Sequence, residues 1–190
     1  MADPVLHLFA GPNGSGKSTL WDRVLEPVLH LEFVNADEIA AARWPDDAEV
    51  QAYDASLLAA ARRDELIAGR ASFATETVFS HPSKLELVEA AVAAGYLVTI
   101  HVLVVPVDFA VARVENRVEN GGHRVPERKV RERFERLWPL LATAVTLVDH
   151  AVAYDSTTGG RFRKVAELER GELLWADWPS WAPEELVALG

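Results

Sequence analysis

A glycine-rich segment near the start of the chain constrains its fold more than any other feature. Residues 11–18 read Gly-Pro-Asn-Gly-Ser-Gly-Lys-Ser and match the pattern G-x-x-x-x-G-K-[ST] at every fixed position. The segment follows the apolar run 5–10, which predicts a buried strand, and precedes a stretch with helical pattern. Glycines let successive backbone N–H groups face one anion, and the helix that follows adds its positive dipole end. The sequence therefore predicts a phosphate-binding loop, the alternative being a chance glycine-rich turn.

The chemistry of this loop predicts ATP and Mg²⁺ as cofactors. Lys17 is expected to reach the β- and γ-phosphates, and the Ser18 hydroxyl to ligate Mg²⁺. The residues predicted to bind the nucleotide are Gly11, Pro12, Asn13, Gly14, Ser15, Gly16, Lys17, Ser18 and Thr19.

Strand-like and helix-like segments alternate along the chain. Strands are expected over 5–10, 31–36, 71–77, 96–105 and 147–154, with helical pattern between them. This order predicts an α/β fold of the P-loop NTPase, nucleotide-kinase-like kind, with a parallel sheet of about five strands and helices on both faces. The 190 residues fit one domain. We therefore expect a single domain over 1–190, with an arginine-rich helical lid at about 113–145 and a C-terminal β-hairpin and tail at about 160–190.

Composition excludes several other classes of protein. The chain has no cysteine, which rules out disulfides, thiolate nucleophiles and cysteine-based metal sites. No apolar run reaches the ~18–20 residues of a membrane span, and no basic segment precedes the first apolar stretch as in a signal peptide. We expect a cytoplasmic protein without a membrane partner.

Charge is distributed unevenly. Nineteen basic and 29 acidic residues give a net charge of −10, but 113–136 holds seven arginines and one lysine against five glutamates, a local +3. Arg113 and Arg117 lie four apart, on one face of a predicted helix, and Gly121-Gly122 suggests a hinge. The segment is either a solvated helix face or a mobile arm that closes on ATP with its arginines. The phosphate-binding loop favours the second interpretation, and we expect no nucleic-acid partner.

Two acidic residues end predicted strands at the edge where ligands of parallel sheets bind. Asp37, in Asn35-Ala36-Asp37, could orient an acceptor hydroxyl and take its proton, or could cap the next helix. Glu76, in Thr75-Glu76-Thr77, could hold Mg²⁺ through water, bind substrate hydroxyls, or be an ordinary strand-end charge.

Together these motifs resemble the zeta-toxin family of P-loop kinases. The resemblance covers about 5–170 and rests on the segments 11–19, 35–37, 75–77, 113–114, 121–126 and 154–156. It implies ATP-dependent phosphorylation of a small hydroxyl-bearing substrate, in the family the 3′-hydroxyl of UDP-N-acetylglucosamine, and it raises the question of a separate antitoxin chain.

The resemblance also assigns roles to residues. It gives Lys17 the place of the loop lysine and Asp37 that of the catalytic base. It puts Glu76, beside Asn35 and Thr77, on the substrate side. Arg113, together with Arg124 or Arg117, takes the place of the phosphate-stabilising arginines. Val78 and Ser156 depart from the family pattern, which places a polar residue and an asparagine there.

Two other functions remain open at this point. The first is a P-loop kinase for another metabolite or an antibiotic hydroxyl, since a fold does not fix the acceptor. The second is an ATP-dependent binding switch without kinase activity. Asp37 and the arginines favour a kinase, because a switch needs no base on the acceptor side.

Overall fold

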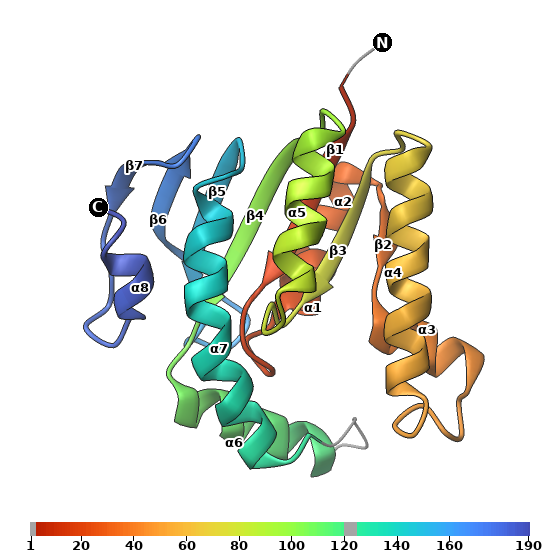
Figure 1. Ribbon diagram of the computed structural model, residues 1–190. Coiled ribbons are helices and arrows are strands. Elements are labelled where there is room, and N and C mark those ends of the chain that lie inside the picture. The colour runs from red at the N-terminus through yellow and green to blue at the C-terminus, as the bar shows by residue number, and fades with distance from the viewer. Residues whose placement is uncertain (1–2, 120–124) are drawn as a thin grey trace.

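The computed structural model describes residues 3–119 and 125–190. One mixed sheet runs through the molecule in the order β2-β3-β1-β4-β5-β6-β7 (Figure 1). Its strands are β1 (Val5–Ala10), β2 (Glu32–Val34), β3 (Phe73–Thr77), β4 (Leu97–Val104), β5 (His150–Asp155), β6 (Arg163–Glu169) and β7 (Glu172–Ala176).

The first five strands in this order, β2 to β5, pair in parallel, so their carboxyl ends meet at one edge of the sheet. This confirms the predicted α/β class. The predicted number of about five strands is wrong, because the C-terminal hairpin continues the same sheet and brings the count to seven. β6 pairs antiparallel with β5, and β7 antiparallel with β6. Arg170 and Gly171 turn the hairpin with φ of 49° and 81°, as two-residue hairpin turns require.

Helices cover both faces of the sheet (Figure 1). Helices α4, α5 and α7 lie on one face, and the short helical segments after β1 lie on the other. The helices are α1 (Lys17–Leu20), the π-helical η1 (Trp21–Leu25), α2 (Glu26–Leu29), α3 (Ala36–Arg43), α4 (Ala52–Ala68), α5 (Ser83–Ala93), α6 (Val107–Glu119), α7 (Glu127–Val145) and α8 (Glu184–Val187). Within the described ranges, none of these helices has the length and apolar character that crossing a bilayer demands.

Alternation along the central strands divides the core between the two faces. Leu6, Leu8 and Phe73 belong to the larger apolar cluster, whereas Phe9 and Ala74 belong to the smaller one with Trp21. Neighbouring residues of a strand point to opposite faces, so each strand contributes to both clusters. The result is a rigid sheet whose carboxyl edge carries the loops that follow β1, β2 and β3.

The predicted lid, about 113–145, covers α6 from Arg113 onward and the whole of α7, and α6 and the first half of α7 lie at the carboxyl edge of the sheet (Figure 1). A separate apolar cluster joins Val111 and Val114 of α6 to Val130 of α7. The second half of α7 packs into the main core through residues such as Leu137 and Leu141. Only the first half of α7 is therefore placed to face a ligand at that edge.

Candidate active site

The loop between β1 and α1 has the backbone that a phosphate cradle needs. Gly16 precedes α1 with φ of 92°, a left-handed conformation that L side chains rarely adopt. A Cβ added to Gly14 would lie 2.9 Å from the Ala110 carbonyl oxygen of α6, so this position also has no room for a side chain. The loop thus packs directly against α6.

Lys17 is buried at the first turn of α1, with 7% of its surface exposed. Its ammonium group donates to the carbonyl oxygens of Pro12 (3.0 Å) and Gly11 (3.2 Å), within the loop. Burial lowers the pKa of Lys17; the Glu76 and Asp37 carboxylates oppose this shift, and the charge of Arg117 adds to it. These influences place Lys17 among the two carboxylates and the arginines at the mouth of the loop.

Ser18 and Glu76 form the second element of the site. Ser18 Oγ donates a 2.8 Å hydrogen bond to Glu76 Oε2, which joins α1 to the end of β3. Hydroxyl and carboxylate oxygens are ligands that Mg²⁺ accepts, so this donor set fits the metal. In the described part of the chain no three acidic or histidine side chains form a metal cage.

The turn after β2 fixes Asp37. Asn35, not Asp37, caps α3: its Oδ1 accepts from the backbone N–H of Asp37 (2.9 Å), and its Nδ2 donates to Glu38 Oε1 (3.3 Å). The alternative role of Asp37 as the helix cap is therefore excluded. The Asp37 side chain is exposed, and within residues 3–119 and 125–190 its carboxylate accepts no hydrogen bond. Its charge acts on Lys17 and Arg133.

Several carboxylates act on Glu38, which follows Asp37 on α3. The pKa of Glu38 is raised, chiefly by burial, while the hydrogen bond from Asn35 opposes the rise. The negative charges of Glu76, Asp22 and Asp37 raise it further. Such a concentration of negative charge at one end of a phosphate-binding loop favours a bound cation.

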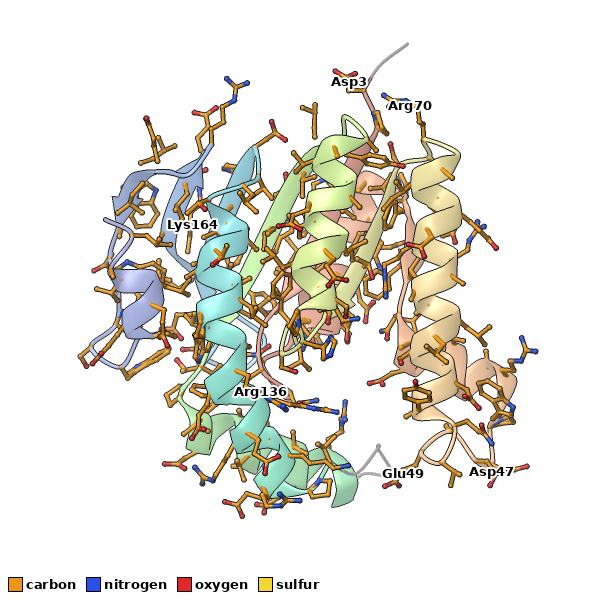
Figure 2. The ribbon with its side chains drawn as sticks, in the orientation of Figure 1. Asp3, Asp47, Glu49, Arg70, Arg136 and Lys164 are labelled. Carbon is orange, nitrogen blue, oxygen red and sulfur yellow. The ribbon has the colours of Figure 1, made fainter. Side chains whose placement is uncertain are left out.

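Arginines from α6 and α7 face this acidic group. Arg133 Nη1 donates to Asn13 Oδ1 in the loop (3.4 Å), and burial, followed by the charge of Arg136, lowers the Arg133 pKa. Figure 2 shows Arg136 on α7 at the same end of the sheet. Arg117 lies near enough to Lys17 to lower the pKa of that lysine. The sequence prediction included Arg117 but missed Arg133, because the spacing of seven arginines does not indicate which of them face the loop.

Arg113 has a different environment from Arg133. Its guanidinium donates to the carbonyl oxygens of Ser156 (2.7 Å) and Gly14 (3.3 Å) and lies 4.5 Å from the ring centre of Phe109. It therefore ties α6 to the loop and to the segment after β5. Its predicted contact with a transferring phosphate stays a prediction. Arg124 and His123 lie outside the described residues.

The remaining predicted residues have identifiable contacts. Thr77 Oγ1 accepts from the backbone N–H of Phe79 (3.2 Å) and shapes the turn after β3. Val78, where the family pattern has a polar residue, packs against the main core. Ser156, where asparagine is usual, is 2% exposed and donates to the Ser15 carbonyl oxygen (2.6 Å). Both departures therefore have structural roles, and the substrate contacts of Asn35 and Thr77 stay predictions.

Comparison with solved structures identifies the same fold in several proteins. A chain of the AvrRxo1-ORF1:-ORF2 structure with ATP superposes with a TM-score of 0.71 at 17% identity over 90% of this chain, and this chain spans 60% of that one. The PezAT toxin–antitoxin system of Streptococcus pneumoniae gives a TM-score of 0.63 at 12% identity, over 100% of this chain and 85% of the other. A gluconokinase from Sinorhizobium meliloti 1021 gives 0.52 at 17% identity, with coverages of 84% and 87%.

These identities establish a shared fold and no more. No curated protein sequence matches the chain significantly. A family model described as an AAA domain, AAA_33, matches residues 6–140. This range includes the phosphate-binding loop, Asp37, Glu76, α6 and the arginine-bearing half of α7. Because the match spans more than half of the 190 residues, the chain belongs to the AAA_33 family of AAA domains.

Proposed function

We propose that the protein is an ATP-dependent kinase that phosphorylates a hydroxyl group of a small molecule. One observation carries this proposal: the Asp37 carboxylate accepts no hydrogen bond within the described residues, yet its charge acts on both Lys17 and Arg133. A carboxylate held beside a phosphate-binding loop without a structural partner is available to a substrate hydroxyl. A nucleotide switch has no need of such a group.

The described residues suggest how the transfer proceeds. Asp37 accepts the proton of the acceptor hydroxyl as its oxygen forms a bond to the γ-phosphorus, while the bond from that phosphorus to the bridging oxygen breaks and ADP leaves. Lys17, Arg117 and Arg133 stabilise the negative charge on the phosphate oxygens. Ser18 and Glu76 would hold Mg²⁺, which would neutralise part of the charge on the phosphate oxygens.

For the acceptor, we propose the 3′-hydroxyl of UDP-N-acetylglucosamine, which the zeta-toxin resemblance implies. Carboxylates and hydroxyls at the ends of β2 and β3 suit a polyhydroxylated molecule, and the nearby arginines suit a diphosphate. A different metabolite or antibiotic hydroxyl remains the alternative acceptor. The gluconokinase among the similar structures has a sugar-acid substrate by its name, which agrees with this broader class.

We also propose that the protein binds an inhibitory partner chain. Two of the similar structures come from two-component assemblies, AvrRxo1-ORF1:-ORF2 and the PezAT toxin–antitoxin system. Such a partner would act by covering the ATP site or the acceptor site. Co-expression with the neighbouring open reading frames and co-purification would test this proposal, and recovery of the protein alone would contradict it.

Mass spectrometry tests the kinase proposal directly. The protein is incubated with ATP–Mg²⁺ and UDP-N-acetylglucosamine, and in parallel with a panel of sugars, sugar acids and aminoglycosides. We expect a UDP-N-acetylglucosamine product heavier by one phosphate. If only another compound is phosphorylated, the kinase proposal stands and that compound replaces UDP-N-acetylglucosamine as the acceptor. ATP hydrolysis with no phosphorylated acceptor would favour a switch.

A further inference from the structure

An arginine of α4 is buried against the sheet without an acidic partner. Arg63 is 6% exposed, and in the described part of the chain its guanidinium makes one hydrogen bond, from Nη1 to Thr75 Oγ1 at 3.5 Å. Charged side chains are rarely buried to this extent unless they are paired. Arginine keeps its charge in proteins, so the fold carries the cost of this buried cation.

The unused donors of Arg63 are open to solvent. None of its nitrogens is among the fully enclosed side-chain atoms that lack a hydrogen-bond partner. Burial lowers the Arg63 pKa, and the carboxylate that opposes this is Asp64, an exposed neighbour in the chain that forms no ion pair with it. Within residues 3–119 and 125–190, the guanidinium thus has donors that are not fully enclosed and that meet no acceptor other than Thr75.

A second cation lies near Arg63. Lys84, at the second position of α5, is partly buried, and in the described residues its ammonium group has no hydrogen bond or ion pair. Burial lowers the Lys84 pKa, and the positive charge of Arg63 lowers it further. The charge of Arg63 on α4 thus acts on Lys84 of α5, and among the described residues no carboxylate forms an ion pair with either side chain.

Arg63 lies near the carboxyl edge of the sheet, where the acceptor position is proposed. Thr75, the partner of Arg63, is in register with Val34 of β2 and also donates to the Val34 carbonyl oxygen (2.7 Å). The next residues along these two strands are Asn35 and Glu76, and Asp37 follows directly. Thr75, the residue that Arg63 contacts, is two residues before the end of β3 and is paired with the last residue of β2. Helices α4 and α5 flank this part of the sheet (Figure 1).

We propose that Arg63 and Lys84 form a subsite for an anionic oxygen group, a phosphate or a carboxylate, carried by the acceptor molecule. The subsite would hold the acceptor by its charged group while the hydroxyl to be phosphorylated faces Asp37. A guanidinium and an ammonium bind such groups with charge-assisted hydrogen bonds. The proposal rests on the kinase function proposed above and narrows its substrate to anionic acceptors, which excludes neutral sugars.

Anion binding can be tested without turnover. The protein is saturated with a non-hydrolysable ATP analogue and Mg²⁺ to occupy the loop. Inorganic phosphate or acetate is then titrated while the side-chain N–H resonances of arginine are followed by NMR. We expect phosphate, acetate or both to shift the Arg63 resonance. The anion that binds with the higher affinity shows whether the subsite prefers a phosphate or a carboxylate. In Arg63→Met and Lys84→Gln the affinity should fall about tenfold or more, the usual loss for a charge-assisted hydrogen bond.

Arg62→Met is the matched control. Arg62 is the next residue on α4, but it is exposed and paired with Glu32 (2.7 Å) and Glu65 (2.8 Å), so its loss should leave anion affinity unchanged. Lys84→Gln keeps the test decisive should Arg63→Met fail to fold. The subsite is overturned if neither anion binds, or if binding is the same in wild type and in Lys84→Gln.

Turnover separates this proposal from the kinase proposal. With UDP-N-acetylglucosamine as acceptor, Lys84→Gln should raise the acceptor KM about tenfold or more and leave the KM for ATP unchanged. N-acetylglucosamine itself should be a poor acceptor for every variant. If no acceptor is phosphorylated, the kinase proposal fails while the anion titration still decides the subsite. If N-acetylglucosamine is phosphorylated as well as UDP-N-acetylglucosamine, the subsite proposal is wrong and the kinase proposal stands.

Discussion

The hydroxyl of Ser18 donates a 2.8 Å hydrogen bond to Glu76 Oε2, and this contact connects the helix after the phosphate-binding loop to the end of β3. β1 and β3 are neighbours in the sheet, so residues that are far apart in the chain meet at one edge. The pair combines a hydroxyl with a carboxylate at the position where Mg²⁺ would meet the nucleotide phosphates. This contact supports the proposal that Glu76 helps to hold Mg²⁺, in addition to its predicted place on the substrate side.

We predict that Glu76→Gln weakens Mg²⁺ binding more than ATP binding. The amide keeps the size of the side chain and can accept from Ser18, but it lacks the negative charge that holds a metal. The Mg²⁺ concentration for half-maximal activity should rise about 10–100-fold, the usual effect of losing a carboxylate next to a bound metal. An activity titration with Mg²⁺ measures this, and an unchanged titration curve would return Glu76 to the substrate side alone.

Lys17→Ala should abolish ATP binding and leave the fold intact. The substitution removes the charge that is expected to reach the β- and γ-phosphates, together with its hydrogen bonds to two loop carbonyls. Removing a buried cation also relieves its desolvation cost, so we expect the melting temperature to stay near that of wild type. Calorimetric titration with ATP–Mg²⁺ and a thermal melt check both parts. Wild-type ATP affinity in this variant would contradict the loop assignment.

Arg133 and Arg113 should respond differently to substitution. Arg133 lies beside Asn13 and Asp37, so Arg133→Gln should lower kcat about 10²-fold or more and leave the melting temperature nearly unchanged. Arg113 joins the loop to the segment after β5, so Arg113→Gln should lower the melting temperature and weaken ATP binding. Steady-state kinetics and thermal melts on both variants make the comparison. Identical effects would show that the two arginines share one role.

Acid should destabilise the protein through a buried histidine. His101 lies between His7 and Phe9, with its Nε2 3.1 Å from His7 Nδ1, and burial lowers its pKa to about 3, with the charges of His7 and His150 adding to the effect. The unfolded chain takes up this proton near pH 6.5 and the folded protein only near pH 3. The free energy of unfolding therefore falls as the pH drops between these values, by up to about 1.4 kcal/mol per pH unit.

Urea unfolding at several pH values measures this dependence. His101→Phe keeps the packing against Phe9. Because unfolding of this variant takes up one proton fewer, its free energy of unfolding should depend less steeply on pH between about 6.5 and 3. His30→Asn, at an exposed position, is the control and should leave the dependence as in wild type. A His101→Phe variant with the wild-type slope would show that other groups dominate.

Local sequence signals predicted the fold and the loop well. The motif at 11–18 is contiguous, and its function depends on backbone conformation, which glycine positions determine directly. The C-terminal hairpin expected within 160–190 is confirmed, and its turn at Arg170-Gly171 also depends on a glycine. That the hairpin extends the sheet was not predicted, because pairing between β5 and β6 depends on side-chain packing across the sheet and not on a local pattern.

Roles that depend on which way a side chain points were predicted less well. Arg113 and Arg133 belong to one basic run, yet one contacts backbone carbonyls and the other faces Asp37. Arg63 did leave a signal: it lies four residues after Ala59 on the buried stripe of α4, where an apolar residue is expected. An arginine on an apolar stripe indicates either a buried ion pair or a binding site for an anionic ligand. The sequence cannot distinguish these two, whereas the structure shows no carboxylate paired with Arg63 among the described residues.

The central claim is that Asp37 takes a proton from an acceptor hydroxyl, and a single-turnover comparison of wild type with Asp37→Asn tests it most directly. Excess protein is mixed with γ-labelled ATP and Mg²⁺, with and without UDP-N-acetylglucosamine, and the label is followed in ATP, free phosphate and acceptor. The account predicts acceptor-dependent transfer in wild type, and in Asp37→Asn a rate lower by at least ~10²-fold with ATP affinity unchanged. Transfer to the acceptor at the wild-type rate in Asp37→Asn would contradict it.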